Sequence, residues 1–128
     1  MNAGSTAPEL RRFTRFLVSG ATSTGVHVAI TATLVTTLAT SPVTANCVAF
    51  VCATACSYLL NTLWSFSSRP HRGNFVRFLS ISLFGLMLTI SISWTLQRLG
   101  ASYWIGLAWI LLLVPPTTFV LHRWWTYR

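Results

Sequence analysis

Hydrophobic residues occur along this chain in four long runs that are separated by short polar or charged segments. The runs cover about residues 16–38, 42–64, 75–96 and 103–120, and each holds at most one charged side chain, Arg77. Runs of this length can cross a hydrocarbon core of about 30 Å as α-helices. Because lipid offers no partner for backbone polar groups, each run is expected to be helical. The pattern therefore predicts an all-α membrane protein with four transmembrane helices.

The composition agrees with a membrane protein and excludes several other classes. The chain is 53% hydrophobic and only 8% charged, whereas soluble domains carry about 25% charged residues. A surface in water cannot be covered with so few charges, which excludes a soluble enzyme or a disordered chain. The net charge of +8 does not indicate nucleic-acid binding, because the arginines lie between apolar runs. The use of Arg without Lys is typical of a GC-rich bacterial genome.

The arginines lie mostly on one side of the predicted membrane segments. Eight of nine precede the first run, flank the connection between the second and third runs, or end the chain: Arg11, Arg12, Arg15, Arg69, Arg72, Arg77, Arg123 and Arg128. Only Arg98 falls on the other side. The positive-inside rule therefore predicts that both termini and the middle connection are cytoplasmic. We expect the protein in the inner, or plasma, membrane.

Residues 1–14 form an N-terminal segment before the predicted membrane domain, which covers residues 15–128. Within this segment, Leu10 and Phe13 lie on one side of a helix, with arginines around them. Such an amphipathic helix lies in the membrane interface and attracts anionic lipids. The alternative is that these residues are simply the start of the first transmembrane helix.

The two halves of the chain resemble each other. Residues 15–17 and 77–79 are both Arg-Phe-Leu, and residues 58–66 and 119–127 both end in Trp, a hydroxyl residue and an aromatic residue. Each half contains two spans, so the halves are expected to have the same orientation in the membrane. The predicted repeats cover about residues 15–67 and 75–128.

These motifs resemble those of the GtrA-like family of small four-span membrane proteins. The resemblance rests on residues 15–20 (RFLVSG), on Ala45-Asn46 and on residues 58–66 (YLLNTLWSF). It implies a role in cell-wall or surface polysaccharide synthesis, as a flippase for a polyprenyl-phosphate-linked monosaccharide. The chain departs from the family pattern at His27, where many members have Asp, at Thr62, where a basic residue is common, and at His122, where Asn is expected.

Three arginines at the predicted cytoplasmic ends are the candidate phosphate ligands: Arg15, Arg77 and Arg123. The guanidinium group presents a planar fork of donors that matches phosphate oxygens. The alternative is that these side chains contact ordinary anionic membrane lipids.

A second set of residues is the candidate polar path for the sugar: Asn46, Ser57, Asn61, His27, Trp64 and His122. Those on the second run recur at three- and four-residue steps and so share a helix face. The alternative is that this face packs against a neighbouring helix, with its asparagines as interhelical hydrogen-bonding groups. His27 is the one titratable side chain in the middle of a span, either as a proton relay or as a neutral, hydrogen-bonded histidine.

No acidic residue lies within any run, which argues against cation export that depends on an intramembrane carboxylate. The sequence also holds no nucleotide-binding glycine loop, no metal-binding Cys/His cluster and no catalytic set. We therefore expect no enzyme activity, no cofactor and no metal. Four helices enclose little volume, so we expect a homodimer or larger assembly. The alternative function is a non-transporting scaffold that recruits or stabilises a glycosyltransferase.

Overall fold

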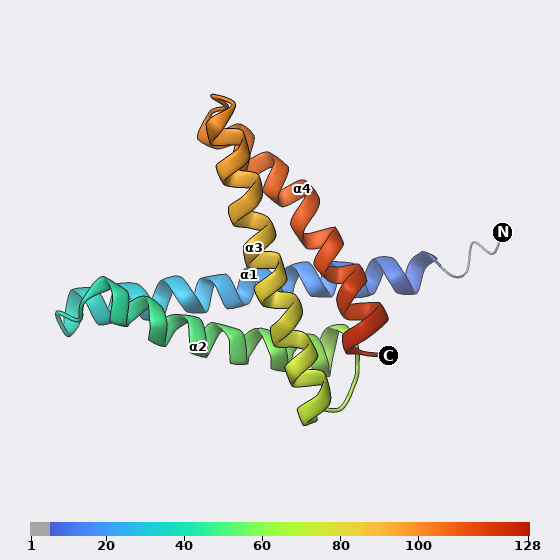
Figure 1. The fold of residues 1–128 in the computed structure, drawn as a ribbon. Coiled ribbons are helices and arrows are strands. Elements are labelled where there is room, and N and C mark those ends of the chain that lie inside the picture. The colour runs from blue at the N-terminus through green and yellow to red at the C-terminus, as the bar shows by residue number, and fades with distance from the viewer. Residues whose placement is uncertain (1–5) are drawn as a thin grey trace. The chain divides into compact units, whose positions relative to one another are not determined.

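The computed structural model describes the backbone of residues 6–128, and the side chains from Ala7 onward except those of Pro42 and Val43. Every regular element in this part of the chain is helical (Figure 1). The α-helices are α1 (Thr6–Thr37), α2 (Pro42–Leu60), α3 (Arg72–Arg98) and α4 (Tyr103–Leu121). α2 and α4 continue directly into the short π-helices η1 (Asn61–Ser65) and η2 (His122–Thr126). Four helices have the length and composition of membrane spans, which confirms the predicted all-α, four-span class.

The chain divides into two compact units. Unit 1 is Met1–Pro70 and unit 2 is His71–Arg128. Each is a hairpin of two neighbouring helices, α1 with α2 and α3 with α4 (Figure 1). The connections at residues 38–41 and 99–102 are short, so consecutive helices are forced to pack against each other.

The predicted N-terminal amphipathic helix is not a separate element. Its described residues belong to α1, which runs without interruption over 32 residues. Pro8 lies in the first turn, where the missing backbone N–H is tolerated, and no Gly follows until Gly20. Arg12 pairs with Glu9 across one turn at 3.2 Å. The remainder of the predicted segment, residues 1–5, lies outside the described residues.

Small side chains fill the contact between α1 and α2 in unit 1. Ala45 and Ala49 are fully buried, and Ala53 is 9% exposed. Ser19 and Ser23 of α1 are also buried, and the Ser23 hydroxyl donates to its own helix at the Ser19 carbonyl, 2.9 Å away. Small residues allow membrane helices to approach closely. The interior of unit 1 along this contact is therefore closed.

Unit 2 has larger side chains in its core and one close helix approach. Phe78 and Ile81 of α3 are buried, as is Phe119 of α4. A Cβ atom added to Gly85 would lie 3.0 Å from Cγ2 of Thr118 on α4. The absence of a side chain at Gly85 is thus what lets the two helices meet at this level.

Polar caps fix where three of the helices begin. The hydroxyls of Ser41 and Ser102 accept from backbone amides of the first turns of α2 and α4. At α3, His71 and Asn74 form a reciprocal capping box, with bonds of 3.1 and 3.2 Å. These bonds satisfy amides that a helix start otherwise leaves without partners.

Candidate functional site

The helices α2 and α4 both end in a π-helical turn that contains a tryptophan. In η1 the Phe66 amide donates to the Asn61 carbonyl at 2.9 Å, and in η2 the Tyr127 amide donates to the His122 carbonyl at 3.0 Å. Both bonds reach five residues back, which defines π-helical geometry. The last carbonyls of any helix lack partners within it. The carbonyls of Trp64 and Trp125 are therefore open to donors from elsewhere in each unit.

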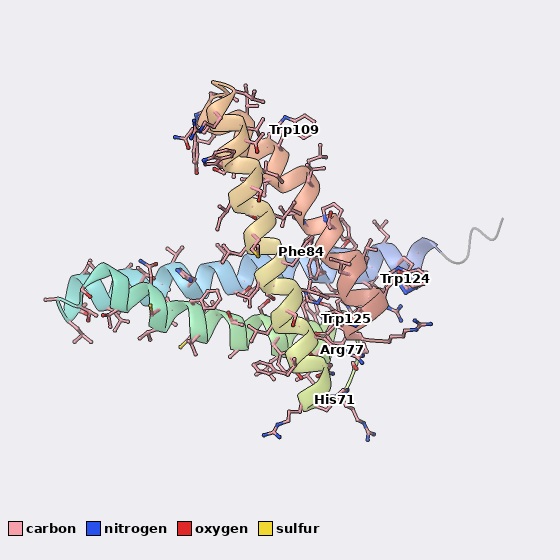
Figure 2. The ribbon with its side chains drawn as sticks, viewed as in Figure 1. His71, Arg77, Phe84, Trp109, Trp124 and Trp125 are labelled. Atoms are coloured by element: carbon pink, nitrogen blue, oxygen red, sulfur yellow. The ribbon has the colours of Figure 1, made fainter. Side chains whose placement is uncertain are left out.

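An arginine of the neighbouring helix donates to each of these carbonyls. Arg15 Nη1 lies 3.1 Å from the Trp64 oxygen, and Arg77 Nη1 lies 3.1 Å from the Trp125 oxygen. Each guanidinium also lies over the same tryptophan ring, with Cζ 5.3 Å and 5.9 Å from the respective centroids. Figure 2 shows Arg77 and Trp125 at one end of unit 2, with Trp109 toward the other. We call these two contacts the Arg–Trp pairs.

The Arg–Trp pairs place a positive charge at the C-terminal end of a helix, where the helix dipole favours it. The pairing also orients the guanidinium, because one of its five N–H donors is fixed to the carbonyl. The remaining donors are not committed to that bond and are held near the end of a membrane-spanning helix.

Buried polar side chains lie at the same end of unit 1. The hydroxyls of Ser19 and Ser65 are 3.0 Å apart, and both residues are at most 1% exposed. Asn61 is 2% exposed, and its Nδ2 donates to the Ser57 carbonyl at 2.8 Å. Its Oδ1 has no hydrogen-bond partner among the described residues. Asn61 and Ser57 are thus brought together here, close in sequence to Trp64.

His122 occupies the corresponding place in unit 2 and is enclosed there. It is 2% exposed and stacks on Phe78, with ring centroids 4.7 Å apart and an angle of 21°. Its Nδ1 lies 3.0 Å from the Thr126 hydroxyl. The Arg123 guanidinium lies over the ring of its sequence neighbour Trp124, 5.7 Å from the ring centroid.

The other predicted path residues of unit 1 form a separate cluster. Nε2 of His27 lies 3.1 Å from Oδ1 of Asn46, and the Thr31 hydroxyl lies 3.5 Å from the same atom. His27 is twelve residues beyond Arg15 in α1, or about 18 Å along the helix at 1.5 Å per residue. Between the two clusters, α2 contributes buried alanines, and α1 contributes the buried Ser23, whose hydroxyl donates to its own helix.

A cavity of about 460 Å³ lies beside the Arg–Trp pair of unit 1. Its apolar walls include Leu10, Val18 and the side chain of Trp64, and Arg11 and Arg15 contribute positive charge. The volume falls in the range of about 300–1,000 Å³ that small-molecule sites occupy. The space is open to the surface and mostly apolar, which suits a hydrocarbon chain, and it has two arginines among its lining residues to attract an anionic head group. We call this space the inner cavity, because it lies on the side that the arginine distribution predicts to be cytoplasmic.

Sequence reasoning named Arg15, Arg77 and Trp64 but did not anticipate how they pair, nor the place of Arg11 in the inner cavity. Arg15 belongs to unit 1, while Arg77 and Arg123 belong to unit 2, so each unit carries part of the predicted phosphate-binding set. One signal was present in the sequence. Each pairing arginine precedes its tryptophan by nearly the same number of residues, 49 in unit 1 and 48 in unit 2.

A family model described as GtrA/DPMS, transmembrane domain, matches residues 15–127. This range includes both Arg–Trp pairs and reaches from α1 to the end of η2. No curated protein and no solved structure matches the chain.

Proposed function

Since the chain belongs to the GtrA/DPMS transmembrane-domain family, we propose that it moves a polyprenyl-phosphate-linked monosaccharide from the cytoplasmic to the outer leaflet. The family resemblance found in the sequence is thereby confirmed. The chain is a multi-pass membrane protein, and its family indicates a membrane function in glycolipid or polysaccharide synthesis. The direction, the flipping step and the polyprenyl carrier are our proposal.

The inner cavity is the observation that carries this proposal. A polyprenyl phosphodiester combines one negative charge, a sugar and a tail that is already soluble in lipid. Moving a charge or an unpaired hydroxyl into hydrocarbon is costly, about 2–7 kcal/mol for a hydroxyl alone. Arg11 and Arg15 supply donors for the phosphate, while Leu10 and Val18 contact the first part of the tail. The ring of Trp64, which Arg15 holds in place, offers a face for the sugar.

The second Arg–Trp pair supports an arrangement of two same-orientation repeats with both termini in the cytoplasm. In this arrangement Arg77, with Arg123 near it in sequence, supplies a second phosphate contact at the inner leaflet. Because small side chains fill the contact between α1 and α2, in our proposal the sugar moves along the lipid-facing surfaces of the helical hairpins. We therefore propose that a homo-oligomer completes the path, in the inner membrane of a bacterium. In this proposal the protein is a carrier that uses no cofactor and catalyses no covalent step.

Uptake into sealed proteoliposomes tests the proposal. The probes are tritiated, short-chain and water-soluble: citronellyl phosphate linked to glucose, mannose or arabinose. We expect wild-type protein to admit at least one probe faster than protein-free vesicles do. Arg15→Lys keeps the charge but loses the planar fork, so uptake is expected to fall about tenfold, the effect of one charge-assisted hydrogen bond of about 1.5 kcal/mol.

Arg12→Lys is the matched control. Arg12 lies on the same helix and pairs with Glu9, and it does not line the inner cavity, so its uptake should equal that of wild type. Equal uptake by Arg15→Lys and wild type would contradict the role of Arg15. If wild type admits no probe, yet co-purifies with a membrane glycosyltransferase and raises its activity, the protein is a scaffold.

A further inference from the structure

Unit 2 contains a second cavity at the end opposite its Arg–Trp pair. Its volume is about 400 Å³, and it lies where α3 ends and α4 begins, next to the connection at residues 99–102. Its lining residues include Ser93, Gln97, Ser102, Tyr103, Gly106 and Ile110. We call this space the loop-end cavity.

Two polar side chains of this cavity are unusual for a membrane helix. Hydroxyls in the helices mostly donate to the carbonyl four residues back, as Ser91 does to Met87 at 2.8 Å. Among the described residues, the Ser93 hydroxyl and the Gln97 amide have no such partner. A polar group near hydrocarbon is costly unless it is hydrogen-bonded. Both groups are therefore available to a ligand or to water in the cavity.

The chemistry of the lining selects a neutral, hydroxyl-rich ligand. Serine and tyrosine hydroxyls and the glutamine amide can all donate and accept hydrogen bonds. None of the described residues that line the cavity is charged. Arg98, the residue after Gln97, lies instead over Trp94, 4.9 Å from the ring centroid. Ile110 adds an apolar wall. A monosaccharide matches this combination, because it carries hydroxyls around a ring whose faces are largely C–H.

We propose that the loop-end cavity binds the sugar of the lipid-linked substrate. This inference rests on the proposed function. With both termini in the cytoplasm, the end of unit 2 opposite Arg77 faces the outer leaflet, so the cavity would receive the sugar after it has crossed. In this proposal, guanidiniums hold the phosphate before the head group crosses, and the neutral groups of the loop-end cavity hold the sugar after it has crossed.

Gly106→Leu is the sharpest perturbation of this site. A Cβ at Gly106 has no neighbour within 4 Å, so the new side chain occupies open space in the cavity without a clash. Leucine also favours a helix more than glycine does, so folding is not expected to suffer. Gln97→Leu is the second variant, because it removes the amide at similar size. Ala108→Leu is the matched control, since Ala108 is exposed on the same helix outside the cavity.

Binding of two probes to the purified full chain in micelles separates the sugar from the phosphate. The first is tritiated citronellyl phosphate-glucose, with the mannose and arabinose forms in parallel, and the second is sugar-free citronellyl phosphate. We expect Gly106→Leu and Gln97→Leu to lower the affinity for the glycosylated probe about tenfold, which corresponds to the loss of one or two hydrogen bonds. The affinity for citronellyl phosphate should not change, and Ala108→Leu should match wild type for both.

Other outcomes overturn the inference. If wild type prefers none of the glycosylated probes to citronellyl phosphate, or if Gly106→Leu weakens both probes equally, the cavity is not a sugar site. If Gly106→Leu binds the glycosylated probe and takes it up into vesicles as wild type does, this inference fails while the proposed flipping stands. If wild type takes up nothing but Gly106→Leu selectively loses the glycosylated probe, the sugar site stands and the flipping fails.

Discussion

The close approach at Gly85 makes the packing of unit 2 testable with one methyl group. An added Cβ would lie 3.0 Å from Cγ2 of Thr118 and 3.8 Å from Cγ1 of Val114. Thr118 cannot easily move away, because its hydroxyl lies 2.9 Å from the Val114 carbonyl and 3.2 Å from the Pro115 carbonyl. It is also only 8% exposed. Gly85→Ala is therefore expected to push α3 and α4 apart.

The size of the effect follows from two opposing terms. Overpacking a well-packed contact costs about 1–3 kcal/mol, while replacing Gly by Ala within a helix gains about 0.5–1 kcal/mol. The net expectation for Gly85→Ala is a loss of about 1 kcal/mol in the free energy of unfolding. Thr118→Ser removes Cγ2 and keeps the hydroxyl. In the Thr118→Ser protein, Gly85→Ala should raise the free energy of unfolding by about 0.5–1 kcal/mol. The effect of Gly85→Ala then differs by about 1.5–2 kcal/mol between the two backgrounds, which is the coupling energy of the two positions.

The free energies of unfolding of the wild type, the two single variants and the double variant form a double-mutant cycle. They are measured by unfolding in SDS mixed micelles, followed by far-ultraviolet circular dichroism. Gly20→Ala is the control, because a Cβ at Gly20 has no neighbour within 4 Å and should bring only the helix-propensity gain. The reasoning is refuted if Gly85→Ala is as stable as Gly20→Ala. It is refuted equally if Gly85→Ala destabilises the Thr118→Ser protein as much as the wild type.

Two further predictions concern unit 1 and the topology. Ser19→Ala or Ser65→Ala leaves one buried hydroxyl unpaired and should lower the free energy of unfolding in SDS by about 1–3 kcal/mol. The double variant should lose less than the sum of the two single losses. Additive losses would show that the 3.0 Å contact between the hydroxyls contributes no coupling. In a cysteine-free background, Ser68→Cys should react with a membrane-impermeant maleimide only from the cytoplasmic side, and Ser102→Cys only from the outer side. The reverse labelling would invert the proposed orientation and remove the loop-end cavity from the outer leaflet.

The four helices could be predicted from the sequence because each depends on local properties. A run of some 20 apolar residues must satisfy its own backbone in lipid, and only a helix does so within one segment. The predicted runs agree with the observed helices to within a turn or two at most ends. The larger difference is at α1, where residues before Phe16 continue the same helix, because nothing after Pro8 interrupts helical geometry.

The candidate site was predictable only as a set of residue types. Arginine was expected near phosphate, and Arg15 and Arg77 do lie at the ends of spans, but each also donates to a tryptophan carbonyl. Asn46 and Asn61 share a helix face in the sequence, yet they join different polar clusters. The periodicity of a sequence predicts which face of its helix a side chain lies on. It does not predict which residue of the neighbouring helix that side chain contacts.

The lengths of the apolar runs, the positions of the arginines and the repeated Trp motifs are local facts, and they were enough to establish the membrane class and the family. Tertiary structure decided which polar groups meet, where alanines close the contact between α1 and α2, and where cavities of about 460 and 400 Å³ stay open. Those outcomes depend on the rotation and separation of two helices at once. The volumes of both partners set that separation, as Gly85 and Thr118 illustrate, and no single segment of sequence contains both volumes.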